Sequence, residues 1–227
     1  MTRKSRTFYT IFVVTGLWVS VANAQFQYFF TNRIVEATAE NLCESVSVFD
    51  QNMSDGEYNF TATATANPIV GCSNFVVSSV AHSSTFAPDI LRGQGQVFSQ
   101  ADGSEFASAS ARSTLEAQFI IDTETPFLLR GGANDNGFVE LEGFGGVTLA
   151  ELRNTSVSSV TGILTPGVYD LNAGVSTSIT DGTAEGDYFF DFQLVPEPSP
   201  ACLLLMGIIP FFQLARKQPI RRQANAT

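Results

Sequence analysis

The stretch YNFTATATA at residues 58–66 decides the fold class of this 227-residue chain. Apolar side chains occupy every second position in it, which is the period of a strand with one face on a core and one in water. The same alternation recurs at residues 115–121, 169–175 and 188–194. Glycine-containing pairs typical of turns separate the apolar runs: Asp55-Gly56, Asp102-Gly103, Gly131-Gly132, Asn136-Gly137, Pro166-Gly167 and Asp181-Gly182. The pattern predicts an all-β body, built as an antiparallel β-sandwich or jelly roll.

Helical periodicity is nearly absent from this body. Residues 33–42 could form a short helix, and no other window competes with the strand pattern. We therefore predict one β domain over residues 25–194, with no linker or internal repeat. Residues 1–24 and 195–227 have a different character and flank that domain.

Charge is distributed unevenly along the chain. The whole sequence has a formal charge of −10, and only 15% of its residues are charged. Residues 25–195 hold 5 arginines, no lysine and 21 acidic residues, so this region is near −16 between two basic ends. A strongly acidic body argues against nucleic acid as a partner, because binding to phosphates needs a basic face. A single histidine leaves little room for histidine-based catalysis or metal sites.

The N-terminus has the three parts of a secretory signal peptide. Arg3, Lys4 and Arg6 precede an uncharged apolar run over residues 8–21. Small residues at Ala22 and Ala24 then predict cleavage by signal peptidase before Gln25. The alternative, an uncleaved anchor, is disfavoured because the run is shorter than the ~20 residues needed to span a bilayer.

The C-terminus carries a second targeting pattern. Its motif is Val195-Pro196-Glu197-Pro198-Ser199, followed by an apolar run at residues 201–215 and by the basic pair Arg216 and Lys217. As a helix this run would reach only ~22 Å, against a hydrocarbon core of ~30 Å. The basic end would stay on the cytoplasmic side. We expect a short hydrophobic helix that anchors the chain transiently in the inner membrane, with the body outside; an ordinary single-pass anchor is the alternative.

This tail resembles the PEP-CTERM sorting signal of Gram-negative and related bacteria, and residues 119–192 are similar to bodies that such proteins commonly carry. The resemblance implies that an exosortase recognises the tail, cleaves near Pro196–Ser199 and releases the body to the cell surface or the medium. It also implies a link to exopolysaccharide and biofilm. Two features depart from the family pattern: Pro210 interrupts the apolar run, and residues 218–227 extend beyond the usual basic end. Signal peptidase and exosortase are thus the expected partners during export.

Few residues suggest a catalytic or metal-binding site. His82 is followed by Ser83 and Ser84, but no nucleophile-elbow motif supports a triad, and we expect a solvated or loop histidine. Residues 134–137 (NDNG) resemble the middle of a calcium loop, yet the flanking ligand positions are Gly132 and Gly143. A hairpin turn at residues 136–137 is the better interpretation. No catalytic, cofactor or metal site is predicted; divalent cations could associate with the acidic body without a dedicated site.

Three functions remain open at this point. The first is a non-enzymatic surface or matrix protein linked to exopolysaccharide. The second is a secreted carbohydrate-binding module, which rests on analogy of fold and is weakened because residues 25–195 contain no tryptophan and only four tyrosines. The third and weakest is a secreted hydrolase.

Two of the three cysteines are expected to pair. Cys202 lies in the apolar tail, which leaves Cys43 and Cys72 in the body. Export would place them in an oxidising compartment, where thiols of a compact domain commonly form a disulfide. Two buried free thiols are the alternative.

Overall fold

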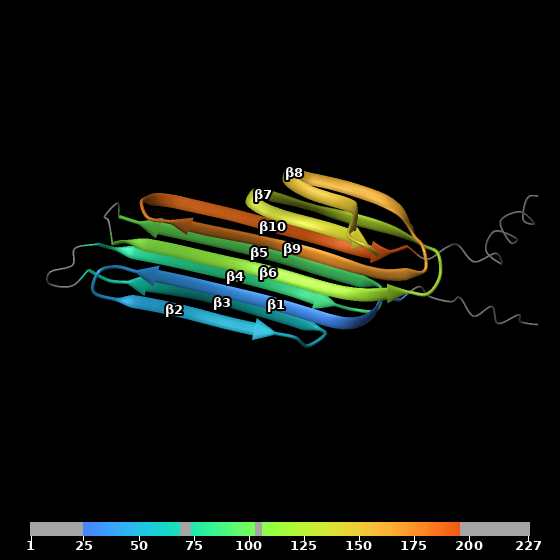
Figure 1. Ribbon diagram of the computed structural model, residues 1–227, viewed down its shortest axis with the longest axis horizontal. Helices are drawn as coiled ribbons and strands as arrows, with labels where there is room; N and C mark the ends of the chain where they lie inside the picture. Colours follow the sequence, from blue (N-terminus) through green and yellow to red (C-terminus); the bar gives the residue numbers. More distant parts are fainter. Residues whose placement is uncertain (1–24, 69–73, 103–105, 196–227) are drawn as a thin grey trace, which may run out of the picture. The chain divides into compact units, whose positions relative to one another are not determined.

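The computed structural model describes residues 25–68, 74–102 and 106–195, and most of them lie in ten strands (Figure 1). The strands are β1 (Gln27–Glu40), β2 (Ser45–Asn52), β3 (Glu57–Ala66), β4 (Val76–Phe86), β5 (Ile90–Ala101), β6 (Ser108–Ile121), β7 (Thr125–Gly143), β8 (Val147–Leu164), β9 (Gly167–Ile179) and β10 (Gly182–Leu194). No helix occurs among these described residues, and so none that could cross a membrane. The predicted all-β body is confirmed, whereas the signal peptide and the C-terminal helix lie outside the described residues.

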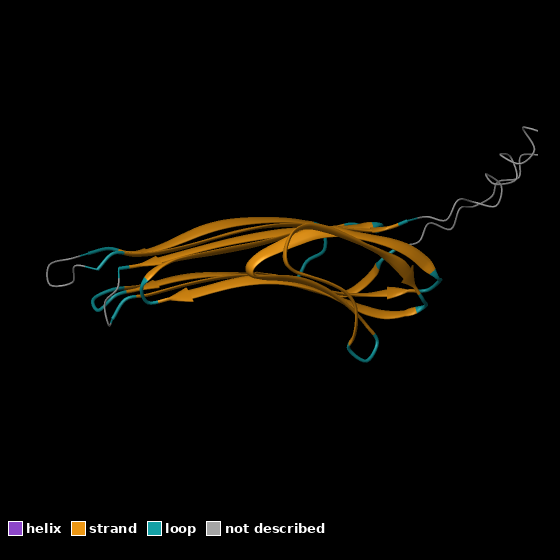
Figure 2. Ribbon diagram, turned by 90° about the horizontal axis from the view of Figure 1, so that it is seen from above, coloured by secondary structure: helices purple, strands orange, loops and turns teal. Residues whose placement is uncertain are grey.

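All ten strands belong to one antiparallel sheet that folds back on itself. The order is β2-β1-β6-β9-β7-β10-β5-β4-β3, and β8 pairs with β7 beside this path. Strands β2, β1, β6 and β9 form one layer, and β10, β5, β4 and β3 form the layer that faces it. Figure 2 shows two layers of strands facing each other. The outermost strands β2 and β3 contact each other, so the sheet is nearly closed. The prediction of an all-β antiparallel body is thus confirmed at the level of one nearly closed sheet, rather than as the two separate sheets of a sandwich or jelly roll.

Strand β7 joins the two layers. Its residues 127–134 pair with β10 of one layer, and its residues 138–143 pair with β9 of the other. Between them the register shifts, and Asp135 and Asn136 adopt φ of 40° and 38°. The predicted hairpin turn at residues 136–137 is therefore wrong, and the Gly131-Gly132 pair also lies inside this strand. A bulge uses the same Asn, Asp and Gly conformations as a turn, so the local signal is the same for both.

The helix considered for residues 33–42 is also absent, because β1 includes residues 33–40 and a loop follows it. Arg33, Val35, Ala37 and Ala39 are buried, and the residues between them are more exposed. Strand β1 pairs with β2 on one side and with β6 on the other. Two ladders of backbone hydrogen bonds and a buried face override the weak helical preference of the local sequence.

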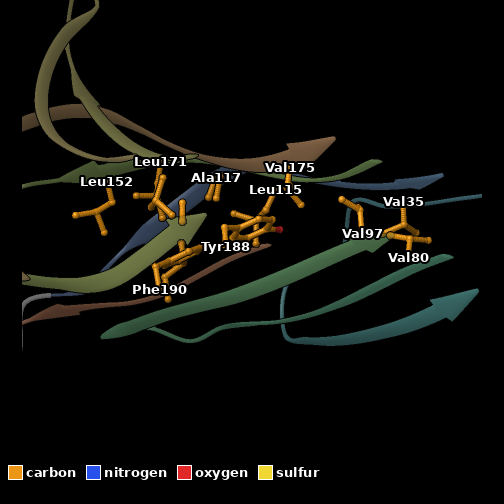
Figure 3. Close-up of a cluster of buried hydrophobic side chains, with 14 of the residues drawn as sticks. Val35, Val80, Val97, Leu115, Ala117, Leu152, Leu171, Val175, Tyr188 and Phe190 are labelled. Atoms are coloured by element: carbon orange, nitrogen blue, oxygen red, sulfur yellow. The ribbon is translucent and has the colours of Figure 1, made fainter. Parts of the chain in front are cut away.

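The core lies between the two layers, where the alternating apolar residues meet. Leu115 and Leu171 come from one layer, and Tyr188 and Phe190 come from the other (Figure 3). All the apolar positions predicted for residues 115–121, 169–175 and 188–194 are buried. The period-2 prediction for these three segments is confirmed residue by residue.

Both ends of the described body lie at the same end of the sheet (Figure 1). The Phe26 N–H donates to the Pro88 carbonyl at 2.6 Å, and the Leu194 N–H donates to the Asp89 carbonyl at 3.1 Å. Pro88 and Asp89 are neighbours in the β4–β5 turn. One turn therefore holds the second residue after the predicted signal-peptidase site and the last residue before the sorting motif.

Candidate functional site

The outer face of the β3-β4-β5-β10 layer is hollowed into an open groove of about 540 Å³. Strand pairing lines up its side chains in two rows across the strands. One row contains Thr61, Ala81, Gln96, Asp187 and Asn134, and the next contains Thr63, Ser79, Phe98 and Glu185. The Asn134 amide nitrogen donates to Asp187 Oδ1 at 3.0 Å, which fixes the end of the first row.

The groove continues along the strands in both directions. Toward Asp135 and Thr183 it shares Phe98 and Glu185 with a neighbouring hollow. In the other direction a hollow around Asn59, Ser83 and Gln94 leads to a third hollow, which is lined by Arg92, Arg130 and Phe189 among others. In the latter, Arg92 and Asp191 form an exposed ion pair at 3.2 Å. Shared lining residues therefore connect these hollows into one surface along the strands.

Groove chemistry suits a neutral ligand rich in hydroxyl groups. Amide side chains such as Gln94 and Gln96 can both donate and accept, and the threonine and serine hydroxyls add further partners. Phe98 is half-buried and Phe189 is 39% exposed, so both offer aromatic surface. Asp135, Glu185 and Asp187 make one end of the groove acidic, which disfavours anions there.

The other polar feature is a buried cluster centred on Arg33. Its Nε donates to Ser84 Oγ at 2.6 Å, and its Nη2 donates to the Gly56 carbonyl at 2.8 Å. Its Nη1 donates to Asn52 Oδ1 at 3.1 Å and to the Ser54 carbonyl. The guanidinium carbon lies 4.0 Å from the centroid of the Phe86 ring. Arg33 is fully buried, and burial lowers its pKa, although Asp55 opposes this effect.

His82 belongs to the same buried cluster, so the expected solvated or loop histidine is wrong. It is 3% exposed on β4; its Nε2 lies 3.1 Å from Ser84 Oγ, and its Nδ1 lies 2.9 Å from Ser113 Oγ. Burial first, and then the nearby Arg33 charge, lowers the pKa of His82 to about 4. Ser84 is buried as well, so both members of this histidine–serine pair belong to the interior. Through Ser113 and Arg33, these hydrogen bonds link the two layers.

The predicted processing residues fall at the limits of the described body. Gln25 is exposed just before β1, and Val195 is exposed just after β10, where its N–H donates to the Pro126 carbonyl at 2.8 Å. The remaining predicted processing residues all lie outside the described residues, namely Ala22, Ala24, Pro196, Glu197, Pro198, Ser199, Arg216 and Lys217. Their roles stay predictions.

Cys43 is disulfide-bonded, and Cys72 lies outside the described residues, as does Cys202. Asn41 organises the loop that contains Cys43: its Oδ1 accepts from the N–H groups of Cys43 and Glu44 at 2.9 and 2.8 Å. Its Nδ2 donates to the carbonyls of Asn67 and Asn74 at 3.2 and 3.1 Å. These two residues flank, on either side, the segment 69–73 that includes Cys72. The geometry around Asn41 supports the predicted Cys43–Cys72 pair, which stays a prediction.

The calcium-loop resemblance at residues 134–137 gains no support from the fold. Gly132 and Gly143 are both part of strand β7, as are the four residues of the motif. Within residues 25–68, 74–102 and 106–195, no group of three His, Cys, Asp or Glu side chains is placed to hold a metal ion.

Comparison with protein-family models finds no match, and comparison with curated proteins finds none either. The resemblance to sorted proteins therefore rests on the residues of the tail and on the likeness of the body, and the role of the body has to be argued from its own surface.

Sequence reasoning did not find the groove. The scarcity of tryptophan and tyrosine argued against an aromatic sugar-binding surface. The aromatic residues of the groove are instead phenylalanines, Phe98 and Phe189. A signal was present in residues 94–97 (QGQV), where polar residues alternate with small or apolar ones, and Phe98 occupies the next position on the polar face. These polar positions share one face because of the order of the strands in the sheet. Alternation within a strand does not reveal that order.

Proposed function

We propose that this chain is an exported protein, sorted by an exosortase to the cell surface or the extracellular matrix, where its body has a non-enzymatic, structural role linked to exopolysaccharide. The observation that carries the proposal is the shared anchorage of Phe26 and Leu194 on the β4–β5 turn. A body whose two ends lie together can remain folded while its tail is held in a bilayer and then cut. Val195, the first residue of the proposed sorting motif, is exposed directly after the last strand.

The composition of the body fits the same role. A charge near −16 without any lysine keeps copies soluble outside the cell and attracts divalent counter-ions without a dedicated site. Sorting would proceed through signal peptidase first and exosortase second, with a transient inner-membrane anchor between the two cuts.

Fractionation of producing cells that contain an exosortase tests this proposal. We expect the wild-type protein in the surface or matrix fraction, and retention in the inner membrane when Pro196, Glu197 and Pro198 are all replaced by alanine. Pro166→Ala, in the β8–β9 turn, is the matched control and should be sorted normally. Surface delivery of the triple variant would refute recognition of the motif.

A second function is favoured by the groove: binding of a neutral polysaccharide. Rows of amide, hydroxyl and carboxylate groups can hydrogen-bond to sugar hydroxyls, while Phe98 and Phe189 can contact the apolar faces of sugar rings. The acidic end of the groove favours neutral over anionic chains.

Glycan-array binding with the full chain tests the second function. Gln96→Ala combined with Phe98→Ala should weaken binding about tenfold or more, since a lost hydrogen bond and a lost aromatic contact are each worth ~1 kcal/mol. Gln118→Ala, on the outer face of β6 in the other layer, is the matched control. If no neutral glycan binds, the binding function is refuted and the structural role alone stands. Hydrolysis of a glycan would instead indicate a hydrolase.

A further inference from the structure

The hollow at one end of the groove contains two arginines on either side of one carboxylate. Strand pairing places Arg92 of β5, Asp191 of β10 and Arg130 of β7 side by side in one row, and both arginines line this hollow of about 450 Å³. The Nε and Nη2 atoms of Arg92 each lie 3.2 Å from Asp191 Oδ2. The Gln193 amide nitrogen donates to the other oxygen, Oδ1, at 2.9 Å. Both oxygens of Asp191 are therefore bonded to groups other than Arg130.

Arg130 makes no ion pair with any residue that the structure describes, and its side chain is exposed. The other acid of the hollow, Glu57, lies on β3, four strands away in the same row, which is ~19 Å at ~4.8 Å per strand. The acidic end of the groove is also distant, because Asp187 lies four residues from Asp191 along β10, or ~13 Å. Both separations exceed the ~8 Å Debye length at physiological salt, so these acids do not cancel the charge of Arg130.

A carboxylate on a sugar ring is the anion that fits the surroundings of Arg130. A guanidinium can donate two parallel hydrogen bonds to the two oxygens of one carboxylate. Phe189 lies two residues from Asp191 on the same face of β10 and is 39% exposed, so its ring can contact the apolar face of a sugar. Gln94 pairs with Phe189 in register and supplies an amide for the sugar hydroxyls. A simple inorganic anion would use the arginine alone, whereas an acidic sugar uses all three side chains.

We propose that Arg130 binds the carboxylate of an acidic sugar unit, and Phe189 the ring of the same unit, at one end of an otherwise neutral chain. This subsite rests on the sugar-binding function proposed for the groove and specifies its ligand further. Neutral units lie along Gln94 and Gln96, and the acidic unit is confined to the Arg130 end because Asp187 repels a carboxylate at the other end.

Calorimetry with the full chain and a matched pair of probes tests the proposal. The probes are a xylo-oligosaccharide that bears one glucuronate and the methyl ester of the same compound, which has no charge. We expect the acid to bind about fivefold more tightly than the ester, as for a favourable exposed ion pair. Arg130→Gln should abolish this preference. Arg112→Gln removes the same charge from an exposed position on β6, in the other layer, and should leave the preference unchanged.

A further variant separates the ring contact from the charge contact. Phe189→Ala should weaken binding of the acid and of the ester by the same factor, because stacking on the ring does not depend on the carboxylate. Equal binding of acid and ester by the wild type, or a preference that survives Arg130→Gln, would overturn the carboxylate subsite and leave sugar binding by the groove intact. Binding of neither probe would also overturn the subsite, while the array of neutral glycans reports separately on the groove.

Discussion

Arg33 on β1 and Ser84 on β4 are joined by a hydrogen bond of 2.6 Å that connects the two layers of the sheet. The same guanidinium also donates to Asn52, the last residue of β2, and to the Ser54 and Gly56 carbonyls in the connection between β2 and β3. Strands β2 and β3 are the outermost strands of the sheet. One buried side chain therefore connects both layers and the turn between these outermost strands. Its described hydrogen-bond acceptors are all neutral, and its stabilising effect depends on the forked shape of the guanidinium.

Replacing the Arg33 guanidinium should lower the stability of the fold even when the positive charge is kept. Arg33→Lys leaves several buried acceptors without a donor, and we expect a loss of about 2–3 kcal/mol in the free energy of unfolding. Urea denaturation of the exported protein measures it. Arg112→Lys, at an exposed position on β6, should change stability by no more than about 0.5 kcal/mol. Equal midpoints for the two variants would show that Arg33 acts only as a charge.

The buried histidine predicts a loss of stability in mild acid. The folded pKa of His82 is about 4, below its ordinary value of 6.5, so between these values the unfolded chain binds a proton that the folded chain does not. The stabilising contribution is complete above pH 6.5 and is lost as the pH falls toward 4, by about 3 kcal/mol.

His82→Gln should remove that pH-dependent difference while other groups titrate as before. His82 is the only histidine in the chain, so the imidazole NMR signal reports its pKa without ambiguity. A signal that titrates near pH 6.5 in the folded protein would contradict its burial.

Glycine is required at position 95 by close packing between the layers. A Cβ atom there would overlap the Tyr188 ring and lie 2.5 Å from Ser113 Oγ. We expect Gly95→Ala to lower the melting temperature through overpacking, at a cost of about 1–3 kcal/mol. Gly167→Ala is the control, because the nearest atoms to its added Cβ lie 3.9 Å away. Similar melting temperatures for both variants would argue against a tight contact at Gly95.

A Cys43–Cys72 disulfide would close a loop of 30 residues. The chain-entropy model gives roughly 3–4 kcal/mol for that length, so reduction or Cys43→Ser should lower stability by that order. Mass mapping of the exported, unreduced protein identifies the partner of Cys43. A peptide that links Cys43 to Cys202 would reject the predicted pairing, and Cys72→Ser would then leave stability unchanged.

The sequence predicted the strands of this fold better than it predicted their connections. Alternation identified the buried residues around Phe119, Leu171 and Phe190 because a strand on a core has period 2 in any topology. It could not distinguish a turn from a bulge at Asn136, since both use the same residues and the same positive φ. The pairing of β7 with strands of both layers shows that this segment is a bulge and not a turn.

The candidate sites were hidden from the sequence for a related reason. Arg33 and Ser84 lie 51 residues apart, and nothing local indicates that they meet. The groove likewise needs Thr61, Gln96 and Asp187 on one face, and strand order alone places them there. Targeting signals behave differently, because they are contiguous in sequence and are read as linear segments.

Intact-mass measurement of the protein from culture medium, cell envelope and inner membrane tests the central proposal of export and sorting most directly. We expect a released form that begins at Gln25 and ends near Pro196–Ser199, together with a longer inner-membrane form that still carries the tail. In a strain with an active exosortase, finding only protein with the full tail in the inner membrane would contradict export and sorting.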